Sequence, residues 1–336
     1  MAGSATSPSS TSGGLKLIGD AVAAAVEATE SGSLPEAAEF IAGGHSGFRV
    51  HDLESSGWDV GDGSTFRVRR GPDYKKNGKK ELSLPQMYDA VAVDCFRVER
   101  RCYPIAPIIN LPALPDHLAD WKHEDVPATF ILNIQLPGAA AKMFSSDIDG
   151  PTVHLIIYYH LRPDAARAIG EGVERQPAHD LWARWCREAF DDEKMRGRFK
   201  MIGVVDNFKD IGLPSILETY NGKPCIIYKT GSIAKGADCT YIEAGINVHL
   251  FPYLTRNMIW SYRAKSLDMQ LHIAGTIEAR SDEEMPERVV FTNRITNMHV
   301  FDSPLLSAAA IDLLMSKAQA TGHNAVIAQA GSEVSK

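Results

Sequence analysis

The sequence predicts a single α+β domain in which a strongly curved antiparallel sheet packs around long apolar helices, an arrangement that could take the form of a helix-grip-like cup. Three observations predict this fold. Apolar residues recur mainly with a period of two from Phe66 onward, separate segments carry helical apolar stripes, and no internal repeat or long linker divides the chain. With 336 residues, of which 44% are hydrophobic and 23% charged, the chain can bury a sizeable core without disulfides or metals.

The period of two is clearest in residues 240–250, where small or apolar side chains alternate with mostly polar or small ones. The same alternation recurs in residues 267–277 and 130–136, and residues 153–161 are apolar or aromatic apart from two histidines. One face of each strand should therefore be dry and the other not, which favours an antiparallel sheet. Further strands are expected at residues 91–97, 199–205, 225–229 and 288–301.

The helix that the sequence predicts most clearly follows Asp180, which can act as its N-cap. Apolar side chains recur at i, i+3 and i+4 in residues 181–190, and they include Trp182 and Trp185. We therefore expect both tryptophans to lie against the core.

Two further helices are expected, at residues 252–264 and 305–318. Ser303 and Pro304 supply a capping hydroxyl and an N1 proline before the second of these, whose nearly all-round apolar character predicts a deeply packed core helix. The Gly-, Ser- and Asp-rich residues 138–151 and the polar residues 163–178 are expected to form long surface loops.

The domain is expected to span residues 41–322. It should follow a disordered tail with a short helix (residues 1–40) and precede a second tail (residues 323–336). The first residues resemble neither a secretory signal nor a transit peptide, and no apolar stretch approaches the ~20 residues that cross a bilayer. Five cysteines without a C-x-x-C pair fit a reducing compartment. These features predict a cytoplasmic protein whose membrane contact is peripheral.

Positive charge is concentrated in residues 66–80. Seven basic residues and one acid give this segment a charge of 7 minus 1, or +6, so the rest of a chain with net charge −7 carries −13. Such a cluster can attract anionic lipid headgroups, each basic residue contributing about 1 kcal/mol before screening. A solvated hairpin explains the same residues, because Asn77-Gly78 is a strong turn signal. Nucleic acid is not expected as a partner, because few aromatic residues accompany the short patch. The candidate headgroup-binding residues are Arg67, Arg69, Arg70, Lys75, Lys76, Lys79 and Lys80.

Two other charged segments are interpreted as surface features. The basic residues within 194–200 form a second basic group, but they directly follow three acids at 191–193, so local ion pairing explains them equally well. The acidic residues within 283–287 surround Met285-Pro286 and are expected to form an exposed turn that leads into a strand.

No specific catalytic motif is present, and we expect a protein that is not an enzyme. Gly44-His45-Ser46-Gly47 lacks the second glycine of a nucleophile elbow, since Phe48 takes its place. Residues 231–236 lack the ending of a phosphate-binding loop, and the histidines show no metal-ligand spacing, so neither cofactor nor metal is expected. An active site would need acids and histidines of two strands, such as His249 and Asp268, to converge in one pocket.

Several segments occur in a recognisable order. They are Trp58, TFRVR at 65–69, Tyr74, Lys80, NIQLP at 133–137, RFKMI at 198–202, GKP at 222–224, YIE at 241–243, Asp268 and EEMPER at 283–288. Together they resemble the C-terminal domain of the plant enhanced disease resistance two proteins over roughly residues 57–300, about 70% of the chain. The chain departs from the family pattern at Arg70, which is an extra residue, at Met285 and at Asn247.

The resemblance implies no catalytic residue, because the family offers none to carry over. Plant members of this family place the domain after a pleckstrin-homology module and a START lipid-binding module, and they are associated with phosphoinositide-containing endomembranes and with regulation of cell death. Neither module occurs in these 336 residues. The resemblance therefore implies a place at the periphery of endomembranes, but it implies phosphoinositide binding by this chain only weakly.

Two functions of different classes remain open. A sheet curved around a helix leaves a concave interior, and if this is incompletely filled it can hold an acyl chain, a sterol or a similar apolar molecule. The first hypothesis is therefore a non-enzymatic lipid-binding or lipid-transfer protein that the basic hairpin orients on an anionic membrane. The second is a protein-interaction or scaffold domain with a solid core and no ligand, whose loops at 138–151 and 163–178 recruit partners. The candidate pocket residues are Trp182, Trp185, Tyr241, Glu243, Asp268 and His272.

Overall fold

The computed structural model describes residues 49–143, 149–227, 229–308, 311–312, 316 and 324–326. The expected tail and helix of residues 1–40, the motif at 44–47 and nearly all of the expected tail at 323–336 lie outside the described residues. The domain limits at 41 and 322 therefore stay predictions.

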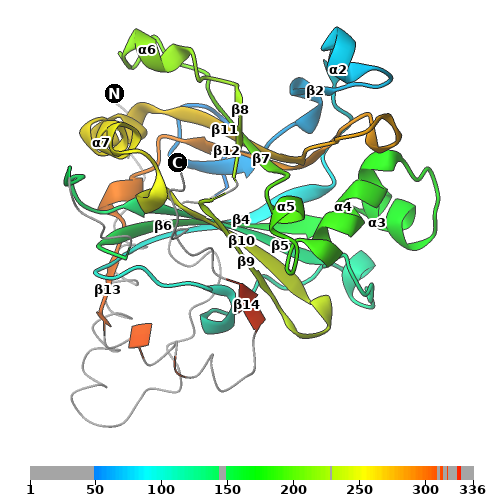
Figure 1. The fold of residues 1–336 in the computed structure, drawn as a ribbon. Helices are drawn as coiled ribbons and strands as arrows, with labels where there is room; N and C mark the ends of the chain where they lie inside the picture. Colours follow the sequence, from blue (N-terminus) through cyan, green and yellow to red (C-terminus); the bar gives the residue numbers. More distant parts are fainter. Residues whose placement is uncertain are drawn as a thin grey trace, which may run out of the picture.

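One large sheet organises the described part of the chain (Figure 1). It contains twelve strands, and β1 (Gly57–Val60) pairs with β12 while β13 (Leu305–Leu306) pairs with β4, beside the main path. From one edge to the other, the main path is β14 (Asn324–Val326), β9 (Gly231–Lys235), β10 (Tyr241–Asn247), β5 (Thr129–Pro137), β6 (Thr152–Leu161), β4 (Tyr88–Val98), β12 (Val289–Thr296), β11 (Gln270–Ile277), β7 (Phe199–Val205) and β8 (Pro224–Ile226).

Every strand that the period of two predicts is present, with ends that differ by a few residues. Most neighbours are antiparallel, as expected, but β10 pairs with β5, and both β12 and β13 pair with β4, in parallel. Long connections separate the members of each parallel pair in the sequence. Such connections allow either direction, which a local hydrophobic pattern does not encode.

The sheet is strongly curled, and aromatic contacts show which face is concave. The rings of Phe130 in β5 and Phe199 in β7 lie 6.4 Å apart, although four strands separate these two in the sheet. The ring of Phe130 also stacks on that of Phe291 in β12, with 4.9 Å between centroids. Side chains on this face therefore meet across the interior of a half-barrel, and they form the main hydrophobic core.

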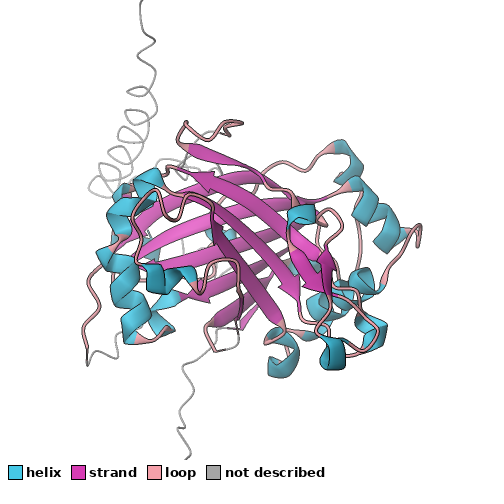
Figure 2. Ribbon diagram, turned by 90° about the horizontal axis from the view of Figure 1, so that it is seen from above, coloured by secondary structure: helices cyan, strands magenta, loops and turns pink. Residues whose placement is uncertain are grey.

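The helices are short and gather at the two ends of the strands (Figure 2). They are α2 (Tyr74–Asn77), α3 (Pro163–Gly170), α4 (Pro177–Glu188), α5 (Glu193–Arg196), α6 (Ser215–Glu218) and α7 (Tyr253–Ser261). The longest described helix, α4, has 12 residues. The α+β class with a curled sheet is confirmed, whereas the long apolar helices of a helix-grip cup are not found among the described residues.

Two helix predictions need correction. Helix α4 begins at Pro177 with Gln176 as its N-cap, so Asp180 lies in its first turn and does not cap it. Residues 163–178 are not a loop, because α3 and the start of α4 occupy most of them. Each helix has a proline at its first position, where proline is favoured, and this signal outweighs the polar composition. The scaffold hypothesis loses one of its two recruiting loops.

The segment after Ser303 begins as a strand. Leu305 and Leu306 form β13 beside β4, and the backbone N–H of Arg97 donates to the carbonyl of Pro304 at 2.7 Å. β12 pairs with β4 only at Tyr88 and Asp89, so the rest of that edge of β4 is available to residues that the sequence assigns to a helix. Residues 308, 311–312 and 316 are helical, and the rest of the predicted helix lies outside the described residues.

The middle of the sheet is buried on both faces. A second hydrophobic cluster covers the convex face, where Cys102, Ile105 and Ile108 pack against Ile131 and Tyr158 of the sheet. The polar residues that alternate along β5 and β10 are consequently buried. The expectation of one dry and one wetter face is wrong here, because an irregular segment without a periodic signal covers the second face.

Candidate functional site

The basic hairpin consists of β2 (Arg67–Arg69), α2 and β3 (Lys80–Leu82). Strands β2 and β3 form a separate antiparallel pair, and Arg67 lies opposite Leu82 in its register. The turn is not the two-residue turn that Asn77-Gly78 predicts. Gly78 instead ends α2 in the left-handed conformation, with φ of 61°, which glycine adopts at little cost. The hairpin is thus confirmed, with a longer tip than expected.

The seven basic side chains of the hairpin divide into two groups. Arg69 is turned toward the sheet, whereas the other six residues are exposed. Two of the exposed six pair within the hairpin, Arg70 with Glu81 at 3.2 Å and Lys76 with Asp73 at 2.8 Å. Among the residues that the structure describes, Lys75, Lys79 and Lys80 have no carboxylate within ion-pair distance. These three lysines leave uncompensated positive charge at the tip.

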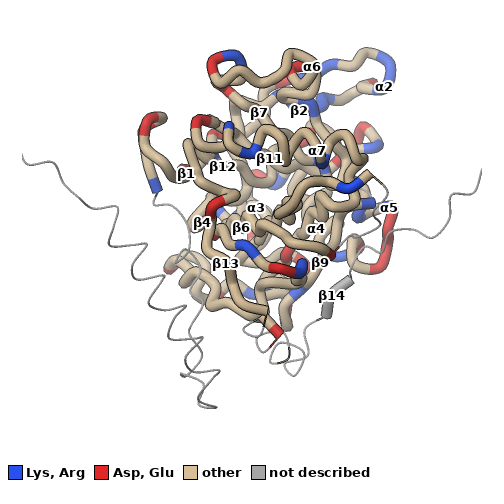
Figure 3. Tube along the Cα trace, turned by 90° about the vertical axis from the view of Figure 1, so that its left-hand side faces the viewer, with Lys and Arg blue, Asp and Glu red and all other residues tan. Residues whose placement is uncertain are grey.

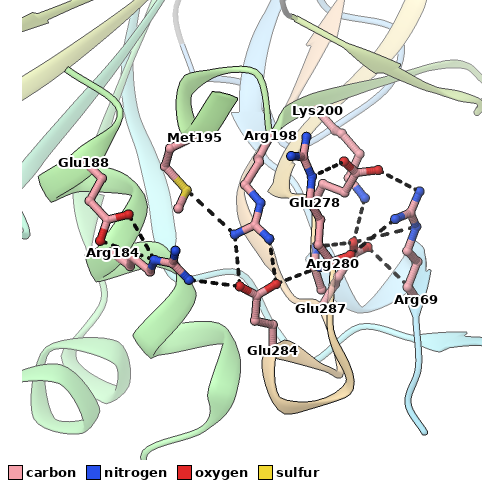
Figure 4. Close-up of polar contacts among 11 residues, drawn as sticks. Arg69, Arg184, Glu188, Met195, Arg198, Lys200, Glu278, Arg280, Glu284 and Glu287 are labelled. Atoms are coloured by element: carbon pink, nitrogen blue, oxygen red, sulfur yellow. Dashed lines mark hydrogen bonds and ion pairs between the residues drawn. The ribbon is translucent and has the colours of Figure 1, made fainter. Parts of the chain in front are cut away.

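Glu287 fastens the hairpin to the sheet (Figure 4). Its carboxylate pairs with Lys200 of β7 at 2.7 Å, and the two side chains are only 2% and 4% exposed. The same carboxylate accepts hydrogen bonds from the backbone N–H groups of Arg69 and Ala279. In return, the backbone N–H of Glu287 donates to the carbonyl of Arg69 at 3.0 Å. Removing this carboxylate would leave a buried ammonium and two backbone donors without their acceptor.

A second pair extends this network. Arg198 binds the Glu284 carboxylate through its two terminal guanidinium nitrogens, Nη1 at 3.0 Å and Nη2 at 2.7 Å. Burial acts to raise the pKa of Glu284, but the bonds from Arg198 and from the backbone N–H of Arg280 outweigh it and leave that pKa below its ordinary value. Burial lowers the pKa of Lys200, and the charge of Glu287 offsets part of this effect. Arg69 completes the network through Glu278, at 2.9 Å.

The network joins three segments that the sequence analysis treated separately. Residues 67–69, 198–200 and 284–287 come from distant parts of the chain, yet they meet beside β7 and β11 (Figure 4). The interpretation of 283–287 as an exposed turn is wrong for Glu287, which is buried. Local pairing is also wrong for Arg198 and Lys200, whose partners lie more than eighty residues away.

Trp182 and Trp185 lie in the core. Their rings stack with 5.2 Å between centroids, and both side chains are almost fully buried. Trp182 also contacts the rings of Tyr88 and Phe130 edge to face. Aromatic side chains therefore fill the α4 end of the half-barrel. The expectation that both tryptophans lie against the core is confirmed.

Tyr241 and Glu243 lie on the opposite, convex face. The Glu243 carboxylate is fully buried and accepts hydrogen bonds from the backbone N–H groups of Ile105 and Ala106 and from the Asn133 amide, at 2.8 to 3.1 Å. Burial raises the pKa of Glu243, although these donors oppose the rise. Glu243 thus holds the covering segment on the convex face, and Tyr241 packs in the same cluster.

Asp268 and His272 do not join the other pocket candidates. Asp268 is exposed at the end of a 3₁₀ helix, Arg263–Asp268. His272 on β11 pairs with Asp206 at 3.4 Å. His249 bonds Thr152 at 2.9 Å, at the far end of β10. Strands β10 and β11 are separated by β5, β6, β4 and β12, so these candidate acids and bases do not converge on one site.

The concave face becomes accessible toward α7. Along β5, Phe130 and Leu132 are fully buried, but Ile134 and Leu136, which point to the same face, are only partly buried. Leu271 on β11 is likewise partly buried against the core. Phe251, Ile259 of α7 and Phe301 are likewise partly buried and pack against the core. The sequence does not reveal this region, because period-two alternation shows which face a residue occupies and not how fully that face is covered.

Two searches of the described residues gave negative results. No group of three or more His, Cys, Asp or Glu side chains is arranged there to hold a metal ion. No helix within the described ranges is both long and apolar enough to cross a membrane.

Comparisons with known proteins gave one match. The family model described as "Protein ENHANCED DISEASE RESISTANCE 2, C-terminal" matches residues 58–299. This range contains the basic hairpin, the ion-pair network and the partly covered end of the concave face, except for Phe301. Neither the comparison with curated proteins nor the comparison with solved structures produced a match.

Proposed function

The chain belongs to the family of the C-terminal domain of protein ENHANCED DISEASE RESISTANCE 2, and from this premise we propose that it is a non-enzymatic lipid-binding or lipid-transfer protein. In this proposal it holds an acyl chain, a sterol or a similar apolar molecule against the concave face at the α7 end. It associates peripherally with anionic membranes through the basic hairpin.

The partly buried apolar residues of the concave face carry the proposal. At the α4 end, aromatic rings occupy the interior, whereas at the α7 end Ile134, Leu136 and Leu271 keep contact with solvent although they belong to the inner face of a curled sheet. Covering apolar surface contributes about 25 cal/mol per Å². An apolar ligand at this end would gain that free energy from residues that the fold itself does not cover.

The hairpin supplies the proposed attraction to the membrane. Lys75, Lys79 and Lys80 project from a tip whose position Glu287 fixes relative to the sheet. Because these lysines lack carboxylate partners in the described structure, their charge is available to phosphate and carboxylate headgroups. Each can contribute about 1 kcal/mol near an anionic surface.

The first experiment looks for the ligand itself. Native mass spectrometry and solvent extraction of the purified protein should reveal a lipid in stoichiometric amount. A protein that is cleanly empty, and that stays empty after incubation with mixed lipid vesicles, would contradict the lipid-binding proposal. If it also ignored anionic vesicles, the scaffold function would take its place.

The second experiment places the ligand. Leu136→Asn adds a polar group to the partly covered end and should lower the amount of co-purified lipid. Leu114→Asn is the matched control, because Leu114 is 43% exposed and lies outside the concave core. Thermal unfolding of both variants separates loss of ligand from loss of fold. Equal lipid content in the two folded variants would show that the ligand does not lie at the α7 end.

The third experiment tests the hairpin. Replacing Lys75, Lys79 and Lys80 with Glu should weaken binding to vesicles that contain phosphatidylserine by at least about 100-fold, since three contributions of about 1 kcal/mol are lost. The control replaces the exposed Lys122, Lys142 and Lys194, which lie outside the hairpin, and changes the net charge by the same amount. Similar losses in both variants would mean that net charge alone governs the association.

A further inference from the structure

An apolar tip projects between β7 and β8. It is formed by residues 207–223, which include α6, and its most exposed apolar side chains are Ile216 at 65% and Tyr220 at 71%. Leu213 and Leu217 beside them are partly exposed. The tip carries Lys209 and Lys223 against Asp210 and Glu218, so its net charge is zero. Large apolar side chains that gather on an exposed projection commonly mark an interaction site.

The base of the tip is firmly held. The side chain of Asn221 accepts a hydrogen bond from the backbone N–H of Val205 at 2.7 Å and donates to its carbonyl at 3.0 Å. The backbone N–H of Gly222 donates to the carbonyl of Gly203 at 2.8 Å. Phe208 and Ile211 are both buried. The exposed residues are therefore presented on a fixed support, while contributing little to the core.

The apolar tip and the basic hairpin project from the same side of the molecule. In Figure 1, α6 and α2 are the two highest parts of the described chain, and they remain so in Figure 3, which is turned about the vertical axis. A flat surface laid across this side would meet both. Leu82 and Leu84, which are 60% and 46% exposed, follow the lysines on the hairpin side.

We propose that the apolar tip inserts Ile216 and Tyr220 into the interfacial layer of an anionic bilayer while the lysines of the hairpin contact its headgroups. This inference rests on the proposed membrane association and assigns it a second point of contact. The charges favour an anionic membrane as the binding partner. The apolar tip has no net charge and the hairpin is cationic, so a bilayer with an apolar interior and acidic headgroups is complementary to both.

General properties of membrane binding favour the combination of one charged and one apolar contact. A polybasic patch or a short apolar anchor alone gives marginal, reversible binding, whereas the two together give stable attachment. Tyrosine suits the interface because its ring is apolar and its hydroxyl can remain hydrated. Two separate contacts also fix the tilt of the protein, which a single contact would leave open.

The test uses a fluorophore that responds to the polarity of its surroundings. Cys225 is the exposed member of the five cysteines and the other four are buried. A Cys225→Ser background therefore lets nitrobenzoxadiazole be attached at Ile216→Cys alone. With vesicles of phosphatidylcholine and phosphatidylserine, the emission should shift to the blue and rise in intensity. The same label at Val173→Cys, exposed on the loop between α3 and α4, should not respond.

A companion variant needs no label. Ile216→Asp together with Tyr220→Asp should lower the affinity for these vesicles by at least about ten-fold, while co-purified lipid and thermal stability stay as in the parent protein. A label at position 216 that stays in water while the protein sediments with vesicles would overturn the inference and leave the hairpin contact standing. Vesicle affinity unchanged by the two aspartates would overturn it as well and point to a protein partner. Loss of co-purified lipid from a folded parent protein would instead count against the proposed function.

Discussion

Glu287 connects the basic hairpin to the sheet. Its carboxylate accepts a charge-assisted bond from the buried Lys200 and a bond from the backbone N–H of Arg69, while its own backbone N–H donates to the Arg69 carbonyl. Breaking a buried pair by removing one partner typically costs about 3–5 kcal/mol, because the other charge remains buried without compensation. Glu287→Ala should therefore lower the free energy of unfolding by roughly that amount, as measured by urea denaturation.

A double variant distinguishes the cost of leaving Lys200 unpaired from the cost of losing the side-chain volume of Glu287. In the double variant Lys200→Met, Glu287→Leu, both charges are replaced by apolar groups of similar size, so much of the stability should return. Glu283→Ala is the control, because Glu283 belongs to the same turn but is exposed. A double variant as unstable as Glu287→Ala would show that the backbone bonds of Glu287, and not the buried lysine, dominate the loss.

Helix α7 is held less firmly than α4. None of its nine residues is buried, whereas α4 buries seven, including both tryptophans. Its side contacts are peripheral: Trp260 meets Phe301 edge to face at 6.4 Å, and the Arg263 guanidinium lies 4.2 Å above the Trp260 ring. A helix in this state opens at a low free-energy cost, which suits an element that borders the proposed ligand site.

Hydrogen exchange gives this difference a measurable form. Amides of α7 should exchange roughly 100-fold faster or more than those of α4, after correction for intrinsic rates. If a lipid lies beneath α7, adding it should slow exchange in α7 and leave α4 unchanged. Equal protection of the two helices in the lipid-free protein would contradict the picture of a loosely held element.

At the same scale, the strands were predictable and much of their surroundings was not. A period of two is a local property, so β5, β7 and β10 could be located from the sequence. The burial of Asn133 and Glu243 could not, because it depends on residues 102–108, which fold over the convex face without any periodic signal. Local composition likewise hid α3 inside an apparently polar loop.

The candidate site was likewise only partly predictable from the sequence. The basic hairpin was visible as a charge anomaly within fifteen consecutive residues. The partners that fix it are Glu278 and Glu287, about two hundred residues away, and only the fold brings them to Arg69. The accessible end of the concave face has no signature at all in the sequence, because Ile134 and Leu136 have the same pattern as the fully buried Phe130 and Leu132.

For the molecule as a whole, the two ends of the half-barrel differ in how fully their apolar side chains are covered. Stacked aromatic side chains close the α4 end, and their contacts join strands that are distant in the sheet. The α7 end keeps apolar side chains in partial contact with water. Stability should therefore depend chiefly on the first end, and any exchange of ligand chiefly on the second. The proposed ligand site and the stabilising aromatic contacts can coexist in one sheet because they occupy opposite ends of its strands.

Three buried histidines make the stability of the whole molecule depend on pH. Burial lowers the pKa of His154 to about 3, assisted by the charges of Arg101 and His249. Burial also lowers the pKa of His160 and of His179 to about 4, with His117 acting on the first and Arg288 on the second. His154 is held by Asn133 at 2.9 Å and stacks on Phe96, so it is buried in its neutral form.

Acid should therefore destabilise the protein through these histidines. In the unfolded chain these histidines bind protons below about pH 6.5, whereas in the folded protein they stay neutral until about pH 3 to 4. Their contribution to stability is fully present above pH 6.5 and is lost as the pH falls toward the folded pKa values, by roughly 1 kcal/mol per pH unit for each histidine. Urea denaturation between about pH 7 and about pH 5 measures this slope. His154→Gln should flatten it by about a third. A parent protein equally stable across this range would refute the assignment of buried neutral histidines.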